Sequence, residues 1–393
     1  MKNSIPPNTL ISNFIKSKNL SKIYTPIVIK HIIAFLTAMV IKGFKAKLTD
    51  VAEISNCHRT TLGHFISKSN WDEEHIKTVI KNESYQYIKT HSENSGEPLF
   101  VSIDDTVNCK TLPSSQALNP IQEAAFHHSH LLKKRVWGHQ VMAMMVSCGD
   151  VALNYDIHRY NKKEQTKIEY AVEQIGLLPI PQNKAYVMAD SWYTNGKIID
   201  ACFSSGYYYI GSMKTNRIIY PQGFRISIAE FADKYIEQND VDLVTVNEHE
   251  YYVYRYEGKL NGIDNAVVLL SWPKDSFKNP KTLRAFICTD TELETATILE
   301  YHGKRWCIET FFGQQKSNLG FGKYQIRSIR GIDRLWTLMS LCHLLCTTGL
   351  GVFMPFGDGL RFLRKKVKEE HISFIYQCAQ KSVPIEDIHA LCI

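Results

Sequence analysis

The sequence predicts a mixed α/β fold that carries a β-strand insertion and has helical segments at both ends. Three observations predict it. Residues 1–95 have only helical patterns, β-rich runs then alternate with helical ones, and a block of short strand-like runs follows before helices resume. At 393 residues and 44% hydrophobic content, the chain is long enough for two or three domains with a large core.

The positive charge is concentrated at the start of the chain. Residues 1–95 carry 13 Lys and Arg against 7 Asp and Glu, or +6 of the total formal charge of +7. Such a charge asymmetry is found in chains that bind nucleic acid. The ordinary hydrophobic and charged fractions exclude a disordered or collagen-like chain.

Residues 1–95 form the first expected domain, a helical DNA-binding domain. Ile27–Phe44 is apolar on most faces and predicts a central helix. Asp50–Phe65 fits a helix–turn–helix template, with Asn56 at the left-handed turn. Its packing positions are Val51, Ala52, Leu62 and Phe65, and its outward positions are Arg59, Thr60, Thr61, His64 and Lys68. The outward side chains can contact phosphates and base edges, so we expect DNA binding here; an ordinary helical hairpin is the alternative.

Residues 96–216 are expected to form the first part of a catalytic core, with the element order β-β-β-α-β-α-β. Cys109–Lys134 is polar and loop-like, and Gly149-Asp150 marks a hairpin. The predicted strands are Leu99–Ile103, Val136–Cys148, Val151–Ile157, Ala185–Ala189 and Tyr207–Ser212, and the predicted helices are Lys163–Leu178 and Asn195–Ser205.

Residues 217–290 read as an all-β insertion, with strand-like runs at Val241–Val246, Tyr251–Tyr256, Ala266–Trp272 and Leu283–Cys288. Residues 291–330 return to helix and complete the core, and residues 331–393 form a helical C-terminal region. The segment Leu335–Gly357 carries no formal charge. We expect a buried core helix there, with a membrane span as the alternative.

The cysteines favour a reducing compartment. Ten cysteines are scattered without a Cys-x-x-Cys pair, and Met1–Pro7 does not open a signal peptide. We therefore expect free thiols and a cytoplasmic protein.

Three carboxylates stand where the fold could bring them together. Asp105 ends the first predicted strand of the core, Asp190 ends the fourth, and Glu309 lies in a later helix. Hard divalent cations such as Mg²⁺ bind carboxylate oxygens, and two such ions about 3.5–4 Å apart can activate water and stabilise a leaving oxygen on a phosphodiester. Taken singly, each acid could equally be a solvated strand end or a helix cap.

The helix around Glu309 adds two cations on one face. Arg305 lies four residues before Glu309 and Lys316 lies seven after it. An acid between two cations can hold a metal while the cations bind DNA phosphates. An exposed ladder of salt bridges is the alternative.

These residues resemble the DDE transposases of bacterial insertion sequences, in the branch with a Tyr-x2-Arg-x3-Glu-x6-Lys signature. The matching segments are Ser102–Val107 (SIDDTV), Tyr186–Tyr193 (YVMADSWY), Lys304–Lys316 (KRWCIETFFGQQK) and Leu319–Arg327 (LGFGKYQIR). The resemblance covers residues 99–330. It implies a ribonuclease-H-like mixed sheet flanked by helices and interrupted by a β-strand insertion.

The resemblance also implies site residues. Asp105, Asp190 and Glu309 would be the catalytic, metal-binding triad, holding two Mg²⁺ ions for which Mn²⁺ can substitute. Asp105 is chosen because it directly precedes Thr, although Asp104 could share its role. The remaining implied residues are DNA contacts: Arg305, Lys316, Tyr301 or His302 at the signature Tyr position, Arg327, and Trp272 as a stacking partner for a flipped base.

The function that follows is cut-and-paste DNA transposition. The protein would bind terminal inverted repeats, cleave the ends with metal-activated water and join the freed 3′-hydroxyls to target DNA. A homodimer on DNA, a nucleoid-associated cytoplasmic location and no membrane contact are the accompanying expectations. The alternatives are a ribonuclease-H-like nuclease without strand transfer and a domesticated, non-catalytic DNA-binding regulator.

Overall fold

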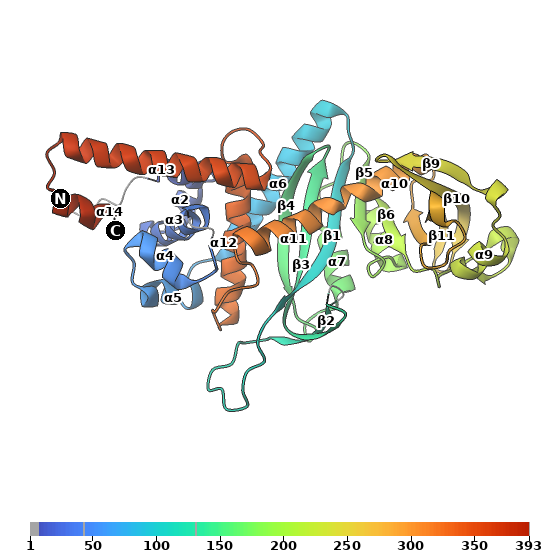
Figure 1. Ribbon diagram of the computed structural model, residues 1–393, viewed down its shortest axis with the longest axis horizontal. Coiled ribbons are helices and arrows are strands. Elements are labelled where there is room, and N and C mark those ends of the chain that lie inside the picture. The colour runs from blue at the N-terminus through green and yellow to red at the C-terminus, as the bar shows by residue number, and fades with distance from the viewer. Residues whose placement is uncertain (1–7, 42–43, 130–131, 393) are drawn as a thin grey trace.

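The computed structural model describes residues 8–41, 44–129 and 132–392 (Figure 1). Its α-helices are α1 (Thr9–Ser17), α2 (Leu20–Ile23), α3 (Pro26–Ile41), α4 (Leu48–Ser55), α5 (Arg59–Ser67), α6 (Glu73–Ser95), α7 (Lys167–Gly176), α8 (Gly196–Ser204), α9 (Ile228–Lys234), α10 (Thr295–Lys304), α11 (Trp306–Asn318), α12 (Ile329–Thr348), α13 (Phe356–Gln380) and α14 (Ile385–Cys392). Its strands are β1 (Leu99–Cys109), β2 (Ala125–Ser129), β3 (Lys134–Cys148), β4 (Val151–Tyr160), β5 (Ala185–Ala189), β6 (Tyr208–Met213), β7 (Ile218–Ile219), β8 (Ile226–Ser227), β9 (Asp242–Val246), β10 (His249–Leu260), β11 (Ile263–Pro273) and β12 (Arg284–Cys288). Three short 3-10 turns lie at Pro221–Gly223, Gln238–Asp240 and Lys274–Ser276.

One mixed sheet runs through the molecule. Its central strands lie in the order β4-β3-β1-β5-β6, with β4, β3 and β1 antiparallel to one another and β1, β5 and β6 parallel. Strand β12 pairs antiparallel with β6, and β11, β10, β7 and β8 continue the sheet from there. The predicted insertion is therefore an extension of the central sheet, at the far end from the N-terminal helices (Figure 1).

Helices cover both faces of the central strands. Ala143 and Met145 of β3 share a buried cluster with Phe311 of α11, on one face. The intervening Met144 belongs to a second cluster with Tyr170 of α7, on the other face. This alternation follows from the two-residue period of a strand, and it means that neighbouring residues of β1 also meet different helices.

The N-terminal helices dock on α12, which contacts α3, α5 and α6 as well as β4. Helix α3 matches the expected central helix up to Ile41; residues 42–43 lie outside the described part of the chain, and Phe44, expected to be helical, is not. Helices α4 and α5 are joined through Asn56, which has the left-handed conformation expected for it (φ 48°, ψ 27°). Leu62 and Phe65 are buried as expected.

Four expectations about the elements are wrong. Strand β1 continues past Ile103 to Cys109, and the polar segment before β3 contains β2. The insertion includes helix α9, so it is not all-β. The helix around Glu309 is two helices, α10 and α11, that meet at Arg305. The early end given to β1 came from its two adjacent aspartates, because Asp is depleted in strands, whereas pairing with β3 on one side keeps the strand extended.

The uncharged segment is confirmed as a core helix from Leu335 to Thr348, and residues 349–355 form a partly exposed connection to α13. Most of α12 is buried, and its residues belong to the same cluster as the N-terminal helices. Among the helices of the described residues, none combines the length and apolar character needed to cross a bilayer.

Candidate active site

Two aspartates directly follow the last paired residues of two neighbouring parallel strands. The pairing of β1 with β5 ends at Ile103 opposite Ala189, so the next residues along the two strands are Asp104 and Asp190. The carboxyl ends of parallel strands meet at one edge of a sheet, which is where binding sites of such sheets usually lie. The register therefore brings Asp104, rather than its neighbour Asp105, level with Asp190.

Arg305 joins Asp104 to Glu309. One guanidinium nitrogen lies 2.9 Å from Asp104 Oδ2 and the other lies 2.5 Å from Glu309 Oε1. Burial raises the pKa of Asp104 to about 6, with the nearby Asp190 and Asp105 carboxylates adding to the rise and Arg305 opposing it. Four charged groups from β1, β5 and the α10–α11 junction are thus concentrated at one edge of the sheet.

Asp105 points to the opposite face of the sheet. Its Oδ2 accepts hydrogen bonds from Lys167 Nζ at 2.7 Å and from the Tyr193 hydroxyl at 2.8 Å. Gln140 donates a further hydrogen bond to Oδ1. Since Tyr193 belongs to the loop that follows Asp190, Asp105 fixes that loop to β1. Sequence reasoning missed these partners because nothing in the local pattern links them to β1.

The donor set suits a hard divalent cation. Asp104, Asp190 and Glu309 offer only carboxylate oxygens, the ligands that Mg²⁺ prefers. Within the residues that the structure describes, no three acidic, His or Cys side chains are already arranged as ligands around one point. The Arg305 guanidinium instead supplies the positive charge between Asp104 and Glu309.

Two of the predicted DNA contacts have partners within the protein. Lys316 Nζ donates to Thr106 Oγ1 at 2.6 Å, and burial lowers the pKa of Lys316. Arg327 is exposed and donates to the Asn119 carbonyl oxygen at 2.8 Å. Lys316 therefore lies on the Asp104 side of β1, because Thr106 is two residues along the strand.

The two candidates for the signature Tyr position have different surroundings. Tyr301 packs edge-to-face on Phe100, with ring centroids 5.0 Å apart. His302 packs against Phe286 at 4.7 Å, and burial, with help from the Arg305 charge, lowers its pKa to about 4. His302 is therefore neutral at pH 7, and Tyr301 belongs to the packing between helix and sheet.

The structure contradicts the prediction for Trp272. Its side chain is 1% exposed, in β11, and packs edge-to-face on Phe277. The Trp272 ring belongs to a buried apolar cluster on one face of the sheet, together with Leu270 of β11 and Phe231 of α9. A ring in this position cannot receive a base.

Most of the segment that carries these acids and cations matches a known protein family. Residues 122–345, more than half of the chain, match the family described as transposase DDE domain. The chain belongs to this transposase family. The match includes Asp190, Arg305, Glu309 and Lys316, whereas β1 precedes it.

The chain has at most weak similarity to curated proteins and to the solved structures described below. No curated protein matches this chain. A cryo-EM structure of a piggyBac transposase synaptic complex with hairpin DNA is 10% identical, covers 91% of this chain and 77% of its own, and has a TM-score of 0.45. A crystal structure of the Mos1 strand transfer complex is 7% identical, covers 53% and 59%, and has a TM-score of 0.17. Both similarities are too weak to establish a shared fold.

The N-terminal helices of this transposase-family chain present the expected polar face. The five outward positions predicted for the second helix are all exposed: Arg59, Thr60, Thr61, His64 and Lys68. Their exposure agrees with a surface available to DNA, and contact with DNA stays a prediction.

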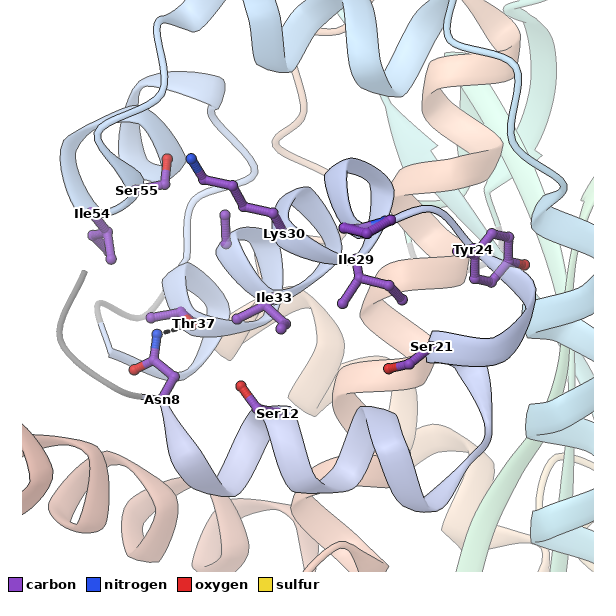
Figure 2. Close-up of a pocket in the computed structure, with 12 residues that line it drawn as sticks. Asn8, Ser12, Ser21, Tyr24, Ile29, Lys30, Ile33, Thr37, Ile54 and Ser55 are labelled. Atoms are coloured by element: carbon purple, nitrogen blue, oxygen red, sulfur yellow. Dashed lines mark hydrogen bonds between the residues drawn. The ribbon is translucent and has the colours of Figure 1, made fainter. Parts of the chain in front are cut away.

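A cavity in the same helical domain is not the acid site. It has a volume of about 480 Å³ and lies between α1, α3 and α4. Figure 2 shows Asn8 and Thr37, joined by a hydrogen bond of 2.9 Å, at one end of it, with Ile29 and Ile33 along its wall. Lys30 is the sole charged residue in its lining, so it offers no carboxylate for metal-dependent chemistry.

Proposed function

We propose that this protein is a cut-and-paste DNA transposase whose metal-binding acids are Asp104, Asp190 and Glu309. One observation carries the proposal: the strand register sets Asp104 level with Asp190, and Arg305 bonds to both Asp104 and Glu309. Asp105 was the acid expected from sequence, but it bonds to Lys167 and Tyr193 on the other face. We assign Asp105 to positioning the loop that carries Asp190.

The chemistry is phosphoryl transfer. When bound, two Mg²⁺ ions, or Mn²⁺ in their place, would activate a water or a 3′-hydroxyl and stabilise the leaving oxygen. The three carboxylates would hold these ions. Arg305, already between two of the acids, can neutralise a non-bridging phosphate oxygen of the strand being cut, because guanidinium–phosphate hydrogen bonds are strong and directional. Lys316, on the same side of β1, can hold a neighbouring phosphate.

The fold agrees with this function. Three antiparallel strands followed by two parallel ones, in the order β4-β3-β1-β5-β6, support a ribonuclease-H-like core. The exposed residues of α5 would recognise terminal inverted repeats, with α4 and α5 acting as a helix–turn–helix. Since two ends must be joined to one target, we expect a homodimer on DNA. We further expect the protein to be encoded by a bacterial insertion sequence and to associate with the nucleoid.

The proposal is tested by nicking and strand-transfer assays on a duplex that carries the inverted repeats flanking the coding frame. Asp104→Asn, Asp190→Asn and Glu309→Gln should each reduce cleavage more than about 100-fold, because losing even an outer partner of a metal ligand costs about 10–100-fold. Asp200→Asn, an exposed acid on α8, is the matched control and should cut normally. Full activity in Asp104→Asn would overturn the assignment.

Metal binding is measured separately, by the rise in melting temperature that Ca²⁺ or Mg²⁺ produces in the absence of DNA. The rise should disappear in Asp104→Asn and persist in Asp105→Asn. Equal cutting of repeat-bearing and random duplexes, with no strand transfer, would point to a nuclease instead. Specific repeat binding without any metal-dependent nicking would point to a DNA-binding regulator.

A further inference from the structure

The loop that follows Asp190 exposes one large ring. Trp192 is 50% exposed, although the next two residues, Tyr193 and Thr194, are buried. Single exposed aromatic rings are common on protein surfaces and usually need no explanation. Trp192 differs in its rigidity, in its charged neighbours and in its place beside Asp190.

The backbone on both sides of Trp192 is held firmly. Its N–H donates to Asp190 Oδ1 at 2.9 Å. Thr194 Oγ1 donates to the Ser212 carbonyl oxygen at 2.7 Å, and the Arg217 guanidinium donates to the Thr194 carbonyl oxygen. With Tyr193 tied to Asp105, the loop is fixed at three successive positions. Because the loop is already ordered, a ligand that packs on the Trp192 ring need not order its backbone.

Two lysines flank the ring. Lys167 Nζ lies 4.8 Å from the ring centroid of Trp192, and Lys214 Nζ lies 5.6 Å from it. The charge of Lys167 is compensated by its ion pair with Asp105, the residue next to Asp104 in β1. Lys214 is exposed at the end of β6 and can turn toward a phosphate. A half-exposed aromatic ring in contact with cations is a combination that binds nucleic-acid strands by stacking and charge, once a mobile side chain such as that of Lys214 turns from the ring to a phosphate.

We propose that Trp192 is a stacking platform for a nucleobase of the DNA strand whose phosphodiester lies at Asp104 and Asp190, and that Lys214 binds an adjacent phosphate of that strand. Trp192 follows Asp190 by two residues and its N–H is bonded to the Asp190 carboxylate, while its ring contacts Lys167 on the Asp105 side of β1. A strand that binds at Asp190 and crosses the end of β5 toward that side therefore reaches the indole. This inference rests on the proposed function and adds a positioning residue to it. Trp192 touches the DNA and takes no part in proton or phosphoryl transfer.

The test combines protein variants with modified DNA, using the duplex that the wild-type protein cuts. Trp192→Ala should weaken binding of that duplex about 5- to 100-fold, the range for loss of one stacked base, and Trp192→Phe should recover much of it. Phe203→Ala is the matched control, because Phe203 is an aromatic residue of α8 that is 86% exposed. Its affinity and cleavage rate should equal those of the wild type. The melting temperature of each variant verifies that it folds.

Abasic nucleotides identify the stacked base. They are placed one at a time at the three nucleotides on either side of the cut, and affinity is measured for wild type and Trp192→Ala. At one position the abasic nucleotide should weaken wild-type binding as much as the mutation does and should cost the variant nothing further. Additive losses at every position, or normal affinity in Trp192→Ala, would overturn the stacking role while leaving transposition intact. A wild-type protein that cuts no duplex would instead overturn the proposed function itself.

Discussion

Replacing Arg334 with methionine should uncouple the N-terminal helices from the rest of the protein. Arg334 is fully buried in α12, and its guanidinium donates to Glu73 at 2.9 Å and to the Ser69 carbonyl oxygen at 2.8 Å. It also donates to the Trp71 carbonyl oxygen and lies 4.2 Å from the Trp71 ring centroid. Arg334 thus connects the core helix α12 to the segment that joins α5 to α6.

The expected loss of unfolding free energy is about 3–5 kcal/mol, the usual cost of removing one partner of a buried ion pair. Most of it arises because the Glu73 carboxylate and the carbonyl groups of Ser69 and Trp71 lose their donor, as do the carbonyl groups of Phe65 and Ile66, each 3.4 Å from the guanidinium. The cavity contribution should be small, because methionine is long, flexible and apolar and can fill much of the same space. Such a loss would be a large fraction of the ~5–15 kcal/mol by which domains are usually stable.

Urea unfolding followed by tryptophan fluorescence measures the loss. Arg330→Met is the matched control, because Arg330 lies one turn earlier on α12, 3.9 Å from the same Glu73, with a side chain that is 44% exposed. That variant should lose less than about 1 kcal/mol, as exposed ion pairs do. If Arg334→Met also loses less than 1 kcal/mol, the argument that this buried pair holds the N-terminal helices in place is refuted.

Two further changes test the same core. Burial lowers the pKa of His343 to about 3, and its ring stacks on Phe356, so folded protein stays unprotonated where the unfolded chain, with a His pKa near 6.5, takes up a proton. The free energy of unfolding of the wild type should therefore fall as the pH drops below 6.5. Because leucine does not titrate, the wild type should lose about 1.4 kcal/mol per pH unit relative to His343→Leu between pH 6 and 4.5. A constant difference between the two proteins over this range would contradict the argument. In Gly359→Ala, the new Cβ would lie 1.8 Å from the Cys346 carbonyl oxygen, so α12 and α13 must separate at a cost of about 1–3 kcal/mol in a denaturation curve. Gly313→Ala, with nothing within 4 Å of its Cβ, should be neutral or stabilise by up to about 1 kcal/mol, and equal effects of the two alanines would rule out the steric explanation.

Several local features were predictable because short-range physics decides them. Strand β5 has the predicted bounds Ala185–Ala189, since a short apolar run between turn residues has few alternatives. The left-handed Asn56 between α4 and α5 was predictable because Asn tolerates that conformation better than most residues. The offsets that place Arg305 beside Glu309 follow from helix geometry alone, and their 2.5 Å contact agrees with it.

The sequence by itself therefore determined the family, through its Arg305–Glu309–Lys316 spacing, and most of the elements of the core. Only the tertiary structure decided which of two adjacent aspartates faces Glu309. The two-residue period of β1 sends Asp104 and Asp105 to opposite faces, and pairing with β3 and β5 fixes which face meets α11. Burial was decided in the same way. The Trp272 ring is buried in an apolar cluster on one face of the sheet, whereas Trp192 lies half-exposed in the loop after β5, a difference that depends on tertiary packing and not on the residues next to either ring in the sequence.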